Sequence, residues 1–464
     1  MSNAKEALVS DVRFILDECA RLHTIVQREG LNAIPREEFL FSLPHPNGVG
    51  HLPCGRAAAL KLTALAEEVA RRGDVTKRVE LGTLKAELGK LIVSRFLAER
   101  RPLDIKQMDR LIQSAIKAVQ RHCVTRTHFV PCHLMSTNDP ERLVMGPVTF
   151  HNRTSFRKLL LGKARNRDDN NPARGNAHDR SLLARAIRYY RNFKWVAEVE
   201  IANCDASTST TLAEEAVTAA LDCLHMLLGV QWTGRMRVGG AGIPNDRKAK
   251  LMLTHSGELE PSMSIAWFGE VAFPDGWSTI LVSPDFRHLQ SLCAVALEAA
   301  VDPDLERPLS RRFLDAAQWF GEASRDSSPA TRTVKFVTAI ERMVMTEERD
   351  DITSVVAERV AALCFDAEKS REAWREKAKE AYNLRSRLVH GSISPRAPKL
   401  RRGAGIAAEV AEATLRRALE AFGIDGLRAE SLKSERLARW FQELLQWAEK
   451  AEVAGFVEGT QGSR

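Results

Sequence analysis

The stretch that decides the fold is FVTAIERMVMTEERDDITSVVAERVAALC, residues 336–364, followed closely by KEAYNLRSRLVHGS, residues 379–392. Its apolar residues recur every three or four positions, which predicts amphipathic helices over 330–346 and 350–364. Residues 305–455 are therefore predicted to form an all-α helical bundle. The other helices expected in this bundle lie at 308–320, 368–390, 406–422 and 432–454.

Two further parts precede the bundle, so the predicted fold class is mainly α with an α+β middle domain. Residues 1–124 show helical periodicity, interrupted by one long loop rich in Pro and Gly between the first two helices. Residues 125–302 alternate strand and helix patterns. Within them, residues 163–180 hold almost no apolar residue besides alanine, which predicts an exposed, mobile loop. The expected elements are strands in THFVPCHL, GPVTFHN and KWVAEVEIANC, strands near 250–255, 263–268 and 278–282, and helices at 205–228 and 286–300.

Composition places the chain among folded proteins of ordinary globular character. It has 464 residues, 44% hydrophobic and 28% charged, with a net charge of +8 and a pI of about 9.1. This mild excess of positive charge permits a polyanionic partner without requiring one. Neither a secretory leader nor a run of eighteen apolar residues is present, and the eight cysteines follow no disulfide-scaffold spacing. We therefore expect a reduced, cytoplasmic protein that does not enter a membrane.

Arg385 and His390, in the segment AYNLRSRLVHGS, are the candidate catalytic residues. A permanently charged arginine can hold a phosphate with two hydrogen bonds, and a histidine can move the proton of a ribose hydroxyl. Five positions are about 140° apart on a regular helix, so the two side chains converge only where the helix ends. Gly391 is predicted to end the helix there.

The same text resembles the HEPN domains, which carry an arginine and a histidine separated by four to six residues. The phrase YNLRSRLVHG, preceded by helices carrying AIER and ERVAALC, is similar to the ApeA-type group of that family. The resemblance covers about residues 308–450. It implies a four- or five-helix bundle that commonly dimerises, and in many members a metal-independent ribonuclease of a toxin or anti-phage system, here with Arg385 and His390 as the motif pair.

The resemblance also implies supporting residues around that pair. Glu341 and Arg359 match recurrent positions and are expected to form a buried ion pair or to contact Arg385. Ser386 stands where active members often have Asn, Asp or His. Independently of the family, residues 381–408 contain no acidic residue, so a phosphate backbone would meet several cations there. The candidate RNA-binding residues are Arg387, Arg396, Lys399, Arg401 and Arg402.

Alternative interpretations remain open for each of these features. The cations at the end of the helix suit its dipole without any substrate, and Ser386 favours an inactive HEPN binding or dimerisation module. A nucleic-acid-binding regulator is also compatible with the net charge. No cofactor is expected, and the spacing of the His and Cys residues matches no zinc finger. These are His51, Cys54, His122, Cys123, His128, Cys132 and His133. We expect RNA and a second copy of the chain as partners, and a trigger ligand or protein at the N-terminal region.

Overall fold

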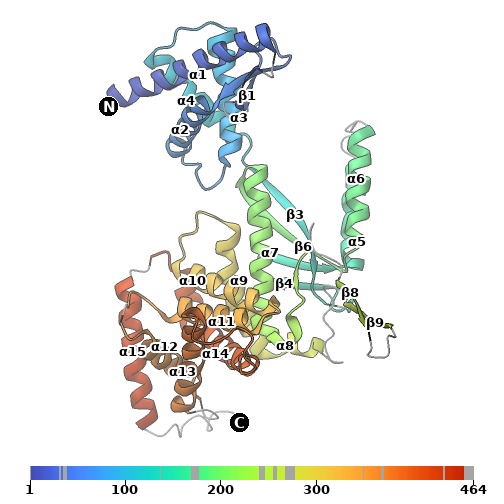
Figure 1. Ribbon diagram of the computed structural model, residues 1–464, viewed down its shortest axis with the longest axis vertical. Helices are drawn as coiled ribbons and strands as arrows, with labels where there is room; N and C mark the ends of the chain where they lie inside the picture. The colour runs from blue at the N-terminus through green and yellow to red at the C-terminus, as the bar shows by residue number, and fades with distance from the viewer. Residues whose placement is uncertain are drawn as a thin grey trace. The chain divides into compact units, whose positions relative to one another are not determined.

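The computed structural model describes residues 2–453, and it leaves out a few short segments of that range (Figure 1). The segments left out are 31–32, 35–38, 136, 169–176, 240–245, 254–258, 267–276, 349, 367–369 and 432–433. Contacts between residues divide the chain into two units. The N-terminal unit comprises residues 1–126 with 201–212, and the C-terminal unit comprises 127–200 with 213–464.

Helices build most of the N-terminal unit, as its periodicity predicts. They are α1 (Ser2–Glu29), α2 (Arg56–Gly73), α3 (Leu81–Ile92), the π-helical turn η2 (Val93–Ala98) and α4 (Ile105–Gln120). Leu62, Leu88 and Leu111, from three of these helices, are almost completely buried in one apolar core. Asp104 caps α4, since its carboxylate accepts a hydrogen bond from the Gln107 amide at 2.7 Å.

A β-hairpin occupies much of the segment predicted as one long loop. Strands β1 (Phe39–Pro44) and β2 (His51–Gly55) pair in antiparallel fashion. The turn residues that suggested a loop belong largely to the six-residue connection between the strands, where Gly48 and Gly50 have φ of +78° and +86°. The structure therefore corrects that prediction: punctuation by Pro and Gly marked the ends of two short strands.

The segment 201–212 folds with the N-terminal unit through Asp205, which precedes α7 (Ala206–Leu228). Its carboxylate accepts hydrogen bonds from the Glu80 amide at 3.2 Å, the Thr83 hydroxyl at 2.5 Å and the Thr208 amide at 2.8 Å. Burial alone would raise the pKa of Asp205, but these hydrogen bonds lower it below its usual value. Asp205 thus caps α7, as predicted, and also ties it to the start of α3.

A five-stranded sheet, in the order β4-β5-β6-β3-β7, confirms the predicted strands of the middle region. Its strands are β3 (Val124–His133), β4 (Arg142–Met145), β5 (Val148–Asn152), β6 (Trp195–Cys204) and β7 (Arg237–Val238). Trp195 and Phe150, which alternate with more polar neighbours, are completely buried. The predicted loop at 163–180 is wrong at both ends, because α5 (Arg153–Asp168) and α6 (Ala177–Tyr190) extend into it. Residues 169–176 lie outside the described residues.

Further along, two strands and one helix agree with the sequence and one strand does not. Strands β8 (Asp246–Leu253) and β9 (Leu259–Ala266) pair with each other, and α9 (Pro284–Val301) follows. The predicted strand at 278–282 is a 3₁₀ helix, η3 (Trp277–Val282), which leads directly into Ser283, the N-cap of α9. Residues 267–268 of one predicted strand lie outside the described residues.

The C-terminal helices form the predicted all-α bundle (Figure 1). They are α10 (Pro308–Arg325), α11 (Pro329–Val344), α12 (Ile352–Cys364), α13 (Arg371–Val389), α14 (Leu400–Arg428) and α15 (Ser434–Val453). Helix α14 contacts α10, α11, α12 and α13, so it is the central helix. It begins six residues earlier than predicted and continues past Gly423, whose φ of +59° marks a kink. Helix α9 contacts both β4 and α14, so sheet and bundle belong to one unit.

Candidate functional site

Arg385 and His390 lie at the C-terminal end of α13, where the sequence placed them. His390 is the C-cap residue, and its amide donates a hydrogen bond to the Ser386 carbonyl at 3.0 Å. Gly391 follows with φ of +71°, a conformation that glycine adopts without strain, and the Ser392 amide then returns to the Arg387 carbonyl at 2.8 Å. The helix therefore ends at the predicted residue, and His390 is exposed to solvent.

Arg385 is held by Glu341 of α11. Its guanidinium donates to the Glu341 carboxylate at 3.4 Å and lies over the ring of Tyr382, 5.7 Å from its centroid. Burial, with the nearby Glu341 carboxylate, raises the pKa of the Tyr382 hydroxyl. The Arg385 side chain is only 26% exposed, and its buried Nε has no hydrogen-bond partner among the described residues. The predicted contact between Glu341 and Arg385 is thus present, and it fixes the direction of the guanidinium.

Arg359 does not reach Arg385, so one predicted alternative for it is wrong. It forms an ion pair with Glu348, donates to the Val344 carbonyl at 2.7 Å, and lies 4.5 Å from the centroid of the Phe441 ring. Burial would raise the pKa of Glu348, but the hydrogen bonds from Arg359 and Thr346 lower it to about 2. Arg359 is therefore a buried structural residue that joins α12 to the loop after α11 and to α15.

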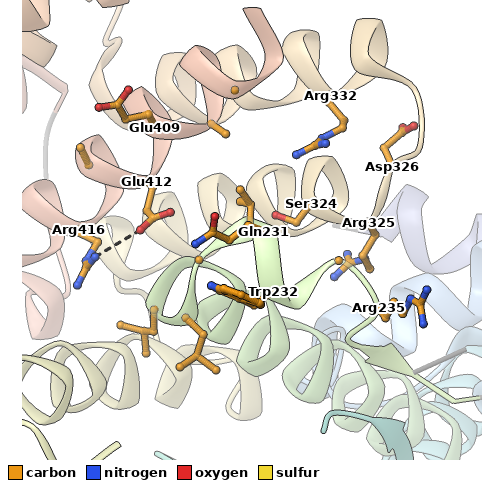
Figure 2. Close-up of a pocket in the computed structure, with 18 of the residues that line it drawn as sticks. Gln231, Trp232, Arg235, Ser324, Arg325, Asp326, Arg332, Glu409, Glu412 and Arg416 are labelled. Atoms are coloured by element: carbon orange, nitrogen blue, oxygen red, sulfur yellow. Dashed lines mark hydrogen bonds and ion pairs between the residues drawn. The ribbon is translucent and has the colours of Figure 1, made fainter. Parts of the chain in front are cut away.

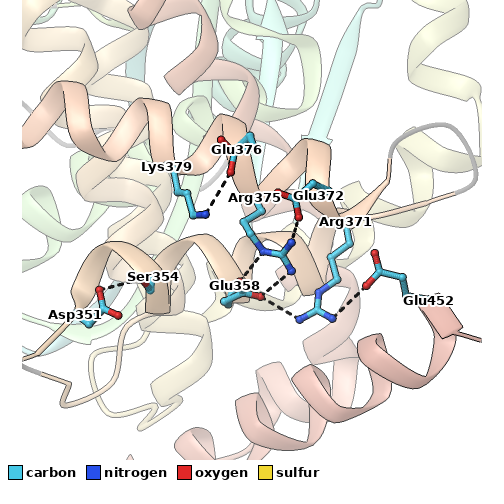
Figure 3. A network of polar contacts seen from close by, with 9 residues as sticks. All are labelled: Asp351, Ser354, Glu358, Arg371, Glu372, Arg375, Glu376, Lys379 and Glu452. Atoms are coloured by element: carbon cyan, nitrogen blue, oxygen red, sulfur yellow. Dashed lines mark hydrogen bonds and ion pairs between the residues drawn. The ribbon is translucent and has the colours of Figure 1, made fainter.

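The first half of α13 is fixed by a network of charged residues (Figure 3). Glu358 of α12 accepts hydrogen bonds from Arg371 at 3.0 Å and from Arg375 at 2.5 Å. Arg371 also pairs with Glu452 of α15 at 3.4 Å, and Arg375 with Glu372. Burial would raise the pKa of Glu358, but the two arginines lower it. This network sets the position of the helix whose far end carries the motif.

The acid-free segment after α13 presents its cations to solvent. Ile393 and Leu400 are buried with Ala330 and Leu384 in a small apolar cluster, which holds the segment against α11 and α13. The five candidate RNA-binding residues are exposed, and none has an ion pair within the part of the chain that the structure describes. They are Arg387, Arg396, Lys399, Arg401 and Arg402. Ser386, beside them, is half-buried. The segment thus joins an anchored backbone to uncompensated positive charge.

A pocket of about 1270 Å³, which sequence reasoning missed, lies elsewhere in the C-terminal unit (Figure 2). It is bounded by α8 (Val230–Thr233), the end of α10, the start of α11 and the middle of α14, with Trp374 of α13 in its wall. Trp374 precedes Arg385 by eleven residues on the same helix, or about 16 Å along its axis. The pocket is therefore a site separate from the motif.

The rejected metal residues stay apart from one another. Among the described residues, no group of three or more His, Cys, Asp or Glu side chains is placed to hold a metal ion. Cys54 instead lies against Cys19, with 2.9 Å between the two Sγ atoms, and His122 lies 3.5 Å from Glu87. Burial raises the pKa of the Cys132 thiol.

Comparisons with known proteins add no further identification. No family model matches the chain, and neither a curated protein nor a solved structure does. Within the described residues, every helix is too short or too polar to cross a membrane. The functional argument therefore rests on the geometry around α13.

Proposed function

We propose that the C-terminal bundle is a metal-independent endoribonuclease of the HEPN type. One observation carries the proposal: Arg385, oriented by Glu341, lies one and a half turns before an exposed His390, beside a segment of five unpaired cations. The proposal includes a homodimer through the bundle, since two such motifs would surround one phosphate with more positive charge. It also includes action in the cytoplasm as a toxin or anti-phage effector, with the N-terminal unit sensing a trigger.

The chemistry needs only the groups at the end of α13. His390 takes the proton of a ribose 2′-hydroxyl, and the 2′-oxygen attacks the adjacent phosphorus. The bond from phosphorus to the 5′-oxygen breaks, and that oxygen leaves with a proton from water or from the second histidine of the dimer. Arg385 stabilises the negative charge on the phosphate, because Glu341 occupies only one edge of its guanidinium. The products are a 2′,3′-cyclic phosphate and a 5′-hydroxyl.

The test is incubation of the purified full-length protein with end-labelled RNA in EDTA. The variants His390→Ala and Arg385→Ala should each lower the cleavage rate by about 10²-fold or more. DNA of the same sequence should remain intact because it has no 2′-hydroxyl. His288→Ala, an exposed histidine of α9, is the matched control. Cleavage that persists in His390→Ala, that requires a metal, or that extends to DNA would contradict the proposal.

The exposed cations give a second, separable readout. Arg387→Ala and Arg401→Ala should weaken RNA binding, and each should reduce the slope of log K against log salt by at most about one. Sedimentation should show a dimer at micromolar concentration. A monomer that cleaves RNA at full rate would contradict the dimeric site.

An inactive binding or dimerisation module is the second candidate. Two observations favour it: Ser386 follows the motif arginine, and the Glu341 carboxylate already pairs with Arg385. This candidate predicts RNA binding or dimerisation without cleavage, and equal behaviour of the wild type and His390→Ala in every cleavage assay.

A further inference from the structure

The pocket beside α8 has two ends of different charge (Figure 2). At one end lie Arg332, Arg235 and the hydroxyl-bearing Ser324, while Glu409 and Glu412 lie at the other. Trp232 lies between these ends, with 42% of its surface exposed. Most small-molecule pockets measure about 300–1,000 Å³, so this one has room for a ligand with several functional groups.

Arg332 supplies charge that the protein itself does not neutralise. It has no ion pair with any described residue, and its Nε is buried without a hydrogen-bond partner. Its guanidinium lies 5.7 Å from the centroid of the Phe336 ring, which holds it in place. Arg332 also belongs to the first turn of α11, where the helix dipole disfavours a cation and favours a bound anion. The neighbouring Asp326 is already paired with Lys335 at 3.2 Å.

The other end of the pocket suits a polar, hydrogen-bonding group. Glu412 is paired with Arg416 at 3.4 Å, and its carboxylate is 26% exposed. Burial raises its pKa above the usual value for glutamate. A carboxyl group in this position can accept hydrogen bonds from hydroxyl or amino groups of a ligand. The indole of Trp232 offers a face on which a planar ring can stack.

We propose that this pocket binds a free nucleotide. The phosphates lie against Arg332, Arg235 and Ser324, and the base stacks on Trp232. The ribose hydroxyls or the amino group of the base face Glu412. This inference rests on the pocket alone and does not depend on RNA cleavage by Arg385 and His390. It assigns a ligand class to a site that the sequence gave no reason to suspect.

The experiment is calorimetric titration of the full-length protein with ATP, GTP, CTP and UTP, and separately with adenosine and inorganic tripolyphosphate. At least one nucleoside triphosphate should bind at submillimolar concentration. Arg332→Gln should weaken triphosphate and tripolyphosphate binding by about tenfold or more and leave adenosine binding unchanged. Trp232→Ala should weaken the triphosphate and adenosine by about fivefold or more. The matched controls are Arg342→Gln on the same helix and Trp319→Ala on α10, both outside the pocket.

Three outcomes would overturn the proposal. None of the four triphosphates binds at 1 mM ligand, about the weakest affinity that such a titration detects. Binding persists at full affinity in Arg332→Gln although circular dichroism shows a folded chain. An eight-nucleotide RNA displaces the bound triphosphate at equal concentration, which would assign the pocket to part of an RNA chain.

Discussion

His225 and Asp222, one turn apart on α7, should respond to acid in opposite directions. Both side chains are completely buried. Burial, with the charge of Arg325, lowers the pKa of His225 from 6.5 to about 3. Burial also raises the pKa of Asp222 from 3.8 to about 7, although Arg325 pairs with it at 2.6 Å and acts against that rise. Each residue therefore binds a different number of protons in the folded and unfolded chain between pH 5 and pH 7.

The sign differs for the two residues. Between pH 7 and pH 5 the unfolded chain protonates His225 and the folded chain does not, so acidification should destabilise the fold by about 2 kcal/mol. Over the same interval the folded chain protonates Asp222 while the unfolded chain leaves it charged. Acidification should therefore stabilise the fold through Asp222 by about 2 kcal/mol. In the wild type the two contributions offset each other.

Single substitutions should separate them. Relative to the wild type, His225→Gln should gain about 2 kcal/mol of unfolding free energy between pH 7 and pH 5, and Asp222→Asn should lose about the same. The measurement is urea unfolding at both pH values, read from α7 peptides by pulsed hydrogen exchange so that the C-terminal unit is followed specifically. His288→Gln is the exposed control. If the pH dependence of all four chains agrees within about 0.5 kcal/mol, the assignment of these two groups is wrong.

Two further predictions concern packing in the bundle. Arg359→Met should lower the free energy of unfolding by about 2–4 kcal/mol, because it leaves a carboxylate without its buried partner. Arg342→Met breaks an exposed pair and should cost less than about 1 kcal/mol in the same thermal melts. Gly403→Ala should destabilise by about 1–3 kcal/mol, since a Cβ there would lie 2.0 Å from Leu384. Gly405→Ala meets no atom within 4 Å, so a comparable loss in urea unfolding would contradict this explanation.

Local signals were sufficient for the helices of the bundle and for the end of α13. Gly391 ends α13 because a helix terminus is determined by a few adjacent residues. The same signals failed for α5, whose Lys, Ala and Arg residues favour a helix without any apolar stripe to reveal it. A search for apolar periodicity treats such a helix as a loop.

Long-range partners were harder to predict than elements. The contact between Glu341 and Arg385 was expected, whereas the partner of Arg359 was not. Glu348 belongs to an irregular loop, and no helical spacing relates it to α12. The pocket was missed for a similar reason: its lining residues come from segments as far apart as Trp232 and Arg416. Their proximity depends on packing between helices, which a pattern along the chain does not contain.

The capping of α7 by Asp205 limits how the protein can be dissected. The chain passes between the two units at residues 126–127, 200–201 and 212–213. A truncated chain beginning at residue 127 would keep Asp205 but lose Glu80 and Thr83, two of the groups that donate hydrogen bonds to its carboxylate. Deleting the N-terminal unit would therefore leave a buried carboxylate short of partners at the start of a helix whose last residues line the pocket. Point variants in the intact chain separate the roles of the two units more cleanly than truncation.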